Sequence, residues 1–323
     1  MGIKKLSKYI KQDNISYEIQ LKDLAFKKIA IDISVLLYQI IISIRNSGDD
    51  LRNHKGDVTS HILGLFNKTV WLISNNIIPI FIFDGKPPKF KEDTIKNRKD
   101  VKNRALEKLK ECTDEKERIK YLKRSTHITS KQIKESKELL DLMGVQYLQA
   151  EGEADILCAK LSEENIVDYV FTEDMDILTF GASKIVKNLF NKKPYEVIEK
   201  LKVLKKYDLS HKQFIIFCII LGCDYHNITF KTELNDAIKL AQNYKFFEHI
   251  KYDNKILTKD KIIEIYNYFY NNTLQYNPNI TLYTPNKNLL NILVKQYGLI
   301  KNKVIWKVKL LEKNIKNINK TNL

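Results

Sequence analysis

Residues 172–180 read TEDMDILTF, and the two carboxylates in this stretch, Asp174 and Asp176, decide how the chain is interpreted. They follow a largely apolar, β-branched run at residues 167–172, which predicts a buried strand. Two ionised carboxylates at the end of such a strand repel each other and lose hydration, so the pair costs free energy of folding. A fold keeps such a pair when a positive charge lies between them. The obvious candidate is a hard divalent metal ion, which prefers oxygen ligands.

The same pattern recurs along the chain, because further acids follow apolar runs. These acids are Asp32, Asp84, Glu153, Asp155 and Asp224. In open α/β sheets, the carboxyl ends of the strands form the edge where sites are built. A single Asp after a strand is most often a helix cap or a turn residue, so each acid alone also has that structural explanation. The recurrence is what favours a shared metal site.

Alternating strand and helix patterns predict an α/β fold. Strands are expected at residues 26–33, 77–84, 145–149, 167–172 and about 184–189, and helices at 35–45 and 58–75. This order favours a mostly parallel sheet flanked by helices. From about residue 205 onward, the pattern is helical throughout.

Composition points to a polyanionic partner. The chain has 323 residues, of which 44% are hydrophobic, enough to bury the core of one large or two small domains. It carries 55 Lys and Arg against 39 Asp and Glu, a formal net charge of +16. A basic chain that clusters acids at strand ends suits a substrate whose phosphates are handled by metal ions. A Lys-rich solvated surface is the alternative explanation of the charge alone.

Cysteine spacing and hydropathy argue against a disulfide-linked secreted protein, a zinc-binding protein and a membrane protein. The four cysteines, Cys112, Cys158, Cys218 and Cys223, form no C-x-x-C pair and have no zinc spacing with His, so we expect reduced thiols in an intracellular protein. The N-terminus has no signal-peptide core, and no apolar run approaches the ~18 residues of a membrane span. We therefore expect no membrane association.

Two segments carry much of the basic charge. Residues 86–137 hold 18 Lys and Arg against nine Asp and Glu, contain no Gly and permit helices after Pro88. This insert joins two predicted ligand strands, so we expect it to rise over the site as a DNA-gripping arch, with a solvated helical pair as the alternative. Residues 295–320 are Lys-rich with only Glu312 opposing. They form either a helix along DNA or a frayed tail.

Several motifs together resemble the XPG/flap-endonuclease family. They are Met1-Gly2-Ile3, Ala30-Ile31-Asp32, Leu37-Tyr38-Gln39, Thr59-Ser60-His61, FDGKPP at 83–88, LMGV at 142–145, GEAD at 152–155, residues 172–181 and LGCDY at 221–225. The resemblance covers residues 1–225 well and the remainder weakly. The combination of FDGKPP with TEDMD is highly specific.

The resemblance implies a division of the chain into segments. We expect an N-terminal nuclease block at residues 1–105, a basic helical arch insert at 86–137 and an internal nuclease block at 138–225. A basic helical C-terminal region with a degenerate helix-two-turn-helix is expected at 205–323. The short spacing between the two nuclease blocks resembles flap endonucleases and related exonucleases.

The resemblance also implies a fold, which is a PIN-like nuclease core with a twisted, mostly parallel sheet between helices. The implied reaction is 5′ structure-specific cleavage of DNA. It requires two Mg²⁺ ions, for which Mn²⁺ can substitute. Two ions ~3.5–4 Å apart would activate a water molecule and stabilise the leaving oxygen. Position 155 holds Asp where flap endonucleases usually hold Glu. The metal-ligand positions carry over onto Asp32, Asp84, Glu153, Asp155, Asp174, Asp176 and Asp224.

Further residues are implied to contact DNA. Lys91 and Arg98 match basic positions at the base of the arch and lie seven residues apart, on one helix face, which suits stabilisation of the phosphodiester. Tyr38 matches the aromatic residue on which the base beside the cut stacks. Without the resemblance, these are surface charges and a core aromatic. Phosphate contacts are expected from Arg45, Lys123, Arg124 and Lys131.

The chain departs from the family in its C-terminal part. No Gly occurs between Gly222 and Gly298, where the family has a Gly-rich turn that binds K⁺ and duplex DNA. Residues 226–234 read HNITFKTEL, so we expect an absent or altered K⁺ site and duplex contacts through Lys side chains. No C-terminal sliding-clamp motif is recognisable, so recruitment by a clamp is not expected. We expect a monomer in the nucleus, with a cytoplasmic viral replication site as the alternative.

The leading functional hypothesis is a metal-dependent 5′ flap endonuclease with 5′→3′ exonuclease activity in DNA replication and repair. The alternatives are a recombination nuclease that cuts branched junctions, a catalytically silent DNA-binding scaffold and an RNA-processing nuclease. The presence of all seven carboxylates disfavours the scaffold. The basic arch and the Lys-rich C-terminus favour duplex DNA over RNA.

Overall fold

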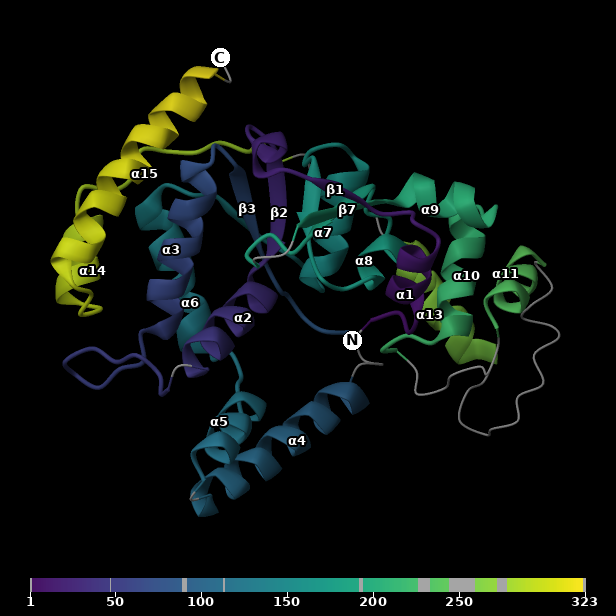
Figure 1. Ribbon diagram of the computed structural model, residues 1–323, viewed down its shortest axis with the longest axis horizontal. Helices are drawn as coiled ribbons and strands as arrows, with labels where there is room; N and C mark the ends of the chain where they lie inside the picture. Colours follow the sequence, from purple (N-terminus) through teal and green to yellow (C-terminus); the bar gives the residue numbers. More distant parts are fainter. Residues whose placement is uncertain are drawn as a thin grey trace. The chain divides into compact units, whose positions relative to one another are not determined.

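The computed structural model describes residues 2–46, 48–88, 92–112, 114–191, 194–225, 233–243, 259–271 and 278–321 (Figure 1). The chain forms two compact units, each assembled from two separate stretches of sequence. The first unit comprises Met1–Asp23 and Ala150–Pro278, and the second unit comprises Leu24–Gln149 and Asn279–Leu323. The expected helix-two-turn-helix turn and its K⁺ site fall largely on residues 226–232, which lie outside the described residues.

The second unit contains three parallel strands. They are β2 (Lys28–Asp32), β3 (Ile78–Phe83) and β4 (Tyr147–Gln149), in the order β2-β3-β4. Every residue of β3 is buried, because a central parallel strand is covered on both faces and so reads as a continuous apolar run. Since the strands are parallel, their carboxyl ends meet at one edge.

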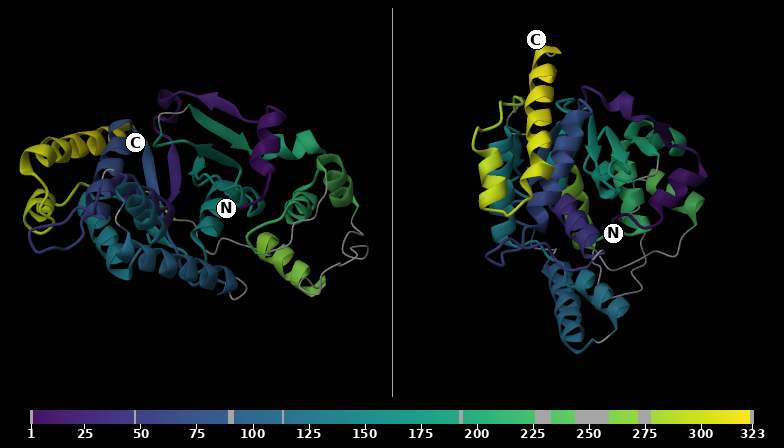
Figure 2. Two further views of the ribbon diagram at one scale, coloured as in Figure 1. Left: turned by 60° about the horizontal axis from the view of Figure 1, so that its bottom comes forward. Right: turned by 60° about the vertical axis from the view of Figure 1, so that its left-hand side comes forward.

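Helices surround these strands in the second unit (Figure 2). The helix α3 (Ser60–Ser74) packs against α2 (Ile33–Arg45), α6 (Ser130–Met143) and α15 (Lys301–Thr321), and α14 (Leu289–Lys295) packs on α15. The insert is helical, as its composition predicted. It forms α4 (Glu92–Glu111) and α5 (Glu115–Arg124), which pack on each other, and α5 also contacts α2 (Figure 1).

The first unit has four strands in the order β1-β7-β6-β5. Strands β5 (Tyr169–Phe171) and β6 (Lys184–Lys187) are parallel, whereas β7 (Tyr195–Glu199) and β1 (Tyr17–Ile19) continue the sheet antiparallel. A 3₁₀ turn at Leu21–Leu24 follows β1. The helices of this unit are α1 (Leu6–Gln12), α7 (Ala154–Glu163), α8 (Asp176–Thr179), α9 (Lys200–Tyr207), α10 (His211–Leu221), α11 (Leu234–Gln242) and α13 (Lys259–Tyr270).

The α/β fold with mostly parallel strands is confirmed, and the five predicted strands occur within a few residues of their expected bounds. Sequence reasoning missed the antiparallel strands β1 and β7. Both are short and carry Glu, and they are held by long-range hydrogen bonds such as Ser16 Oγ to Glu196 at 2.6 Å, which no local pattern announces.

The prediction of helix throughout from residue 205 is wrong at one described place. Leu282 forms an antiparallel bridge with Val145 beside β4, and the backbone N–H of Tyr283 donates to the carbonyl of Gly144 at 2.8 Å. The segment is extended because it supplies backbone hydrogen bonds to the edge of the second unit's sheet.

The structure shows the state of the cysteines and the hydropathy of the described helices. All four cysteines are thiols rather than disulfides, as their spacing predicted. Among the helices described, none has the length and apolarity required to cross a bilayer.

Candidate active site

In the second unit, one serine contacts two of the predicted metal ligands. Asp32 ends β2, and Asp84 directly follows β3. The parallel register pairs Asp32 with Ile82, which brings both acids to the same edge. The backbone N–H of Ser34 donates to Oδ1 of Asp32 at 2.7 Å, and its hydroxyl donates to Oδ2 of Asp84 at 2.7 Å. Ser34 therefore links two carboxylates that come from different strands.

Further hydrogen bonds fix the backbone around these acids. Oδ1 of Asp32 also accepts from the N–H of Val35 at 3.3 Å, so Asp32 caps helix α2 as well as ending β2. At the end of β4, Nε2 of Gln149 donates to the carbonyl oxygens of Asp84 at 2.7 Å and of Phe83 at 3.3 Å. The chain is thereby held where it leaves β3.

Of the residues predicted to act on the DNA near the cut, Tyr38 has a described side chain. Tyr38 is 39% exposed and lies one helical turn after Ser34 on α2, so its ring is accessible on the side of the helix that touches the acids. Lys91 lies outside the described residues, and of Arg98 only the backbone, within α4, is described. Their roles stay predictions.

Arg45 has protein partners that sequence reasoning did not foresee. Its guanidinium binds both carboxylate oxygens of Asp50, at 3.0 and 2.8 Å. It also donates to the carbonyl of Leu122 at 2.9 Å and to Oγ1 of Thr126 at 2.7 Å. Arg45 therefore joins the end of α2 to the end of α5, and so secures the helical insert.

The other basic residues predicted to contact phosphate lie near the C-terminal end of the insert, where α5 meets α2. Lys123 and Arg124 form the last turn of α5, where Arg124 is exposed. Lys131, in the first turn of α6, donates to Oδ1 of Asp57 at 2.8 Å, and both side chains remain solvent-exposed. An ion pair between exposed charges of this kind contributes little to stability and leaves Lys131 able to exchange partners.

In the first unit, Asp174 packs against the N-terminal segment. Gly2 has a φ of 90°, and a Cβ at this position would lie 1.7 Å from Oδ1 of Asp174. The backbone N–H of Asp174 donates to Oγ1 of Thr172 at 2.9 Å, and Oδ1 accepts from the N–H of Asp176 at 3.2 Å. Asp176 is only 4% exposed and begins α8. The two acids of the TEDMD motif thus share one tight turn.

Three of the predicted ligands, Glu153, Asp155 and Asp176, lie near one buried phenol. Burial raises the pKa of Tyr225 well above its usual value, and the negative charges of these three carboxylates raise it further. The hydroxyl of Tyr225 donates to Oε2 of Glu153 at 3.1 Å. Asp224 directly precedes this tyrosine in the chain. The first unit therefore gathers acids around the end of α10 as well as in the TEDMD turn.

A partly buried ion-pair network supports the end of α8. Nζ of Lys200 donates to the carbonyl of Gly181 at 2.7 Å and to Oε1 of Glu163 at 3.1 Å. Nζ of Lys160 binds Oε2 of Glu163 at 2.6 Å. Burial alone would raise the pKa of Glu163, but the hydrogen bonds and charges of the two lysines lower it, so this carboxylate stays ionised and its network intact.

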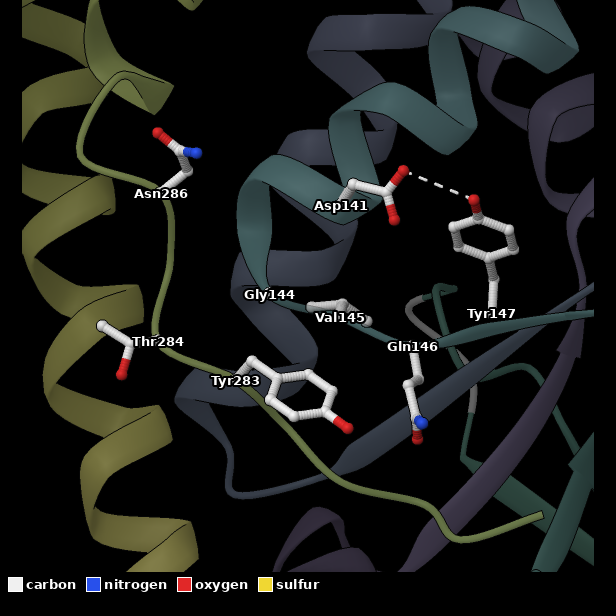
Figure 3. Close-up of a pocket in the computed structure, with 8 residues that line it drawn as sticks. All are labelled: Asp141, Gly144, Val145, Gln146, Tyr147, Tyr283, Thr284 and Asn286. Atoms are coloured by element: carbon white, nitrogen blue, oxygen red, sulfur yellow. Dashed lines mark hydrogen bonds between the residues drawn. The ribbon is translucent and has the colours of Figure 1, made fainter.

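Two surface hollows lie apart from these acids. Figure 3 shows one of about 540 Å³ in the second unit, where the side chains of Tyr283 and Gln146 approach each other below the Asp141–Tyr147 hydrogen bond. The other, of about 400 Å³, lies between Tyr17 and Asn188 in the first unit. Neither is lined by any of the seven carboxylates, so neither belongs to the candidate site.

The donor chemistry suits hard divalent ions. All seven predicted ligands offer carboxylate oxygens, the ligand type that Mg²⁺ and Mn²⁺ prefer. Among the described residues, no three His, Cys, Asp or Glu side chains already lie close enough to enclose an ion. Mg²⁺ keeps several water ligands and takes only one or two carboxylates directly, so a looser arrangement still fits it.

Sequence reasoning missed the supporting residues rather than the acids. The start of the helix that carries Ser34 had a usable signal, because Asp is a preferred N-cap residue and Asp32 caps α2. Gly2 belongs to the Met1-Gly2-Ile3 motif, but its close approach to Asp174 and the hydrogen bonds of Gln149 became visible only in the structure. A further supporting residue, Tyr268, comes from a helix 115 residues from its partner Glu153, so no local pattern indicated it.

Comparison with known proteins adds independent information. Two family models match: the XPG N-terminal domain over residues 1–105 and the XPG I-region over residues 144–224. Flap endonuclease 1 of Leishmania braziliensis is 42% identical over 238 residues, or 70% of this chain. The match spans 60% of the length of that relative.

Solved structures agree in fold. The flap endonuclease-1 of Methanococcus jannaschii superposes with a TM-score of 0.72 and 30% identity, covering 94% of this chain and 96% of that one. The catalytic core of Rad2, solved in complex with DNA substrate, has a TM-score of 0.70 and 25% identity, covering 96% of this chain and 100% of that core.

Proposed function

The chain belongs to the XPG family of nucleases, and we propose that it is a structure-specific 5′ nuclease that cuts flapped DNA and trims 5′ ends. The observation that carries the proposal is the presence of all seven carboxylates, several of which are oriented by hydrogen bonds from neighbouring groups.

We propose that the seven acids Asp32, Asp84, Glu153, Asp155, Asp174, Asp176 and Asp224 are ligands of two Mg²⁺ ions. When bound, such ions would activate water and stabilise the leaving oxygen. Ser34, Tyr225 and the TEDMD turn orient the carboxylates, so that less reorganisation is required when an ion binds. No His or Ser nucleophile is needed for this chemistry.

The DNA contacts are proposed on charge and exposure. The accessible ring of Tyr38 suits stacking on a base beside the cut. Lys91 and Arg98 would stabilise the phosphodiester, and Lys123, Arg124 and Lys131 would contact phosphates. Arg45 would act mainly by holding the insert in place, since its guanidinium already makes four hydrogen bonds to Asp50, Leu122 and Thr126. We also propose a monomer and a nuclear location.

Cleavage of a 5′-labelled double-flap DNA tests the proposal. We expect a cut near the flap base that requires Mg²⁺, is abolished by EDTA and is lost in Asp174→Ala. Glu164→Ala, an exposed acid at the end of α7, is the matched control and should cut normally. An intact flap at enzyme concentrations that saturate DNA binding, in Mg²⁺ and in Mn²⁺, would contradict the nuclease assignment and favour the scaffold.

A further inference from the structure

Two tyrosine hydroxyls donate to the same oxygen of a predicted metal ligand. Oε2 of Glu153 accepts from the hydroxyl of Tyr268 at 2.6 Å and from that of Tyr225 at 3.1 Å. The three residues come from separate elements of the first unit. Glu153 directly precedes α7, Tyr225 follows α10, and Tyr268 lies on α13. The carboxylate is therefore held by residues far from it in sequence.

Ring packing determines where the two hydroxyls lie. Phe180, which is fully buried, contacts Tyr268 edge-on with ring centroids 5.6 Å apart, and Tyr225 with centroids 6.4 Å apart. The rings of Tyr225 and Tyr268 are themselves 5.5 Å apart, and Phe269 packs 5.0 Å from Phe180. These separations are typical of stabilising aromatic pairs. Packing of the two phenol rings therefore fixes the positions of the hydroxyls that bind Glu153.

We propose that Tyr268, acting with Tyr225, is a positioning residue for Glu153, so that the seating of helix α13 sets the orientation of a metal-binding carboxylate. This inference rests on the proposed function, because it assigns Glu153 to metal binding. Two donors on one oxygen restrict rotation of the carboxylate about the Cγ–Cδ bond, and hydrogen bonds to an ionised group are stronger than those between neutral groups.

The arrangement makes the nuclease centre dependent on the C-terminal helices. Helix α13 packs against α10, the helix that ends just before Asp224. If α13 shifts, the Tyr268 hydroxyl moves with it and Glu153 loses the shorter of its two phenol hydrogen bonds. The C-terminal part of this chain, where the resemblance to the family is weak, therefore has a direct role at the metal site. This role is additional to any role in holding duplex DNA.

The test removes one hydroxyl and keeps its ring. Tyr268→Phe should weaken Mn²⁺ binding to the full chain without DNA, followed by the EPR signal of the free ion, by roughly 10-fold or more. It should lower kcat while KM and DNA affinity in Ca²⁺ stay within about 2-fold. Tyr270→Phe is the matched control, because that tyrosine lies on the same helix and is 39% exposed. It should behave as the unmodified chain does.

A second variant separates positioning from folding stability. In a Glu153→Gln background, Tyr268→Phe should cause no further loss of Mn²⁺ affinity, because its effect passes through the carboxylate. If Tyr268→Phe binds Mn²⁺ as tightly as the Tyr270→Phe control does, the inference is wrong, even if the melting temperature falls. If the unmodified chain binds Mn²⁺ but cuts no flap, the proposed nuclease function fails while the positioning role of Tyr268 can still be measured.

Discussion

The hydroxyl of Ser34 donates a hydrogen bond of 2.7 Å to Oδ2 of Asp84, a residue 50 positions away at the end of the neighbouring strand. The backbone N–H of the same serine binds Asp32. One side chain near the start of α2 thus connects the acids of two strands. Because a donor of this kind orients a carboxylate ligand, its removal should affect metal binding before it affects folding.

We therefore expect Ser34→Ala to lower the flap-cleavage rate by about 10-fold and to raise the Mg²⁺ concentration needed for half-maximal rate. The backbone N–H is retained, so the cap of α2 by Asp32 survives and the loss of stability should be about 1 kcal/mol. Titration of the rate with Mg²⁺, together with urea unfolding, measures both. A normal Mg²⁺ profile would show that the Ser34 hydroxyl does not orient Asp84.

The close approach of Gly2 to Asp174 makes a steric prediction. Gly2→Ala places a Cβ 1.7 Å from Oδ1 of Asp174, so the carboxylate must move. We expect at least a 10-fold loss of cleavage rate and weaker metal binding, in line with disturbance of a ligand. Gly56→Ala is the matched control, since Gly56 also has a positive φ, of 84°, but its Cβ would meet nothing within 4 Å. Equal activity of the two variants would contradict the close approach.

Buried His61 predicts a pH dependence of stability. Burial, assisted by the charge of Lys131, lowers the pKa of His61 to about 4, so the neutral ring donates from Nε2 to Glu135 at 2.9 Å as a hydrogen bond rather than an ion pair. Above about pH 6.5 the ring is neutral in both states. Between pH 6.5 and 4 the unfolded chain binds the proton and the folded chain does not, so the free energy of unfolding falls, by up to about 3 kcal/mol.

The measurement is urea unfolding of the chain and of His61→Gln across this pH range. Gln can still donate to Glu135 but does not titrate, so its stability should fall less steeply between pH 6.5 and 4. Identical pH profiles of the two proteins would mean that protonation of His61 does not lower the free energy of unfolding.

The outward face of α15 predicts a salt-dependent DNA contact. Its buried side is formed by apolar residues such as Val304 and Leu311. The opposite stripe is exposed and consists of Trp306, Lys309, Lys313, Lys316 and Lys320. Lysines at i and i+4 repel each other, so the stripe weakens the helix unless an anion screens it. Phosphates of duplex DNA are the anions that a nuclease of this family meets.

Replacing Lys309 and Lys313 together by Ala should weaken DNA binding and reduce the slope of log affinity against log salt by roughly 1 for each phosphate that the variant no longer binds. The control replaces Lys205 and Lys206, exposed in the last turn of α9, which leaves the net charge of the two variants equal. Equal salt slopes for the two variants would show that the exposed lysines of α15 do not contact DNA phosphates.

Local sequence was sufficient for the carboxylates and for the strands that carry them. Asp174 and Asp176 follow a run whose β-branched and apolar residues favour a strand. Asp32 and Asp84 likewise stand at the ends of the apolar runs that form β2 and β3. These features depend on residues within a few positions of one another, so periodicity and composition reveal them. Family membership followed from the same short motifs.

Tertiary structure decided what holds those acids. The Ser34–Asp84 bond spans 50 residues, and the Tyr268–Glu153 bond spans 115. Arg45, which is predicted to contact phosphate, also binds Asp50 and the end of α5, partners that its sequence neighbourhood did not indicate. Strands β1 and β7 pair antiparallel, a direction that their polar sequences did not indicate. Side-chain partners of this kind depend on which elements pack together. Since the packing free energy is summed over the whole core, no local window of sequence contains it.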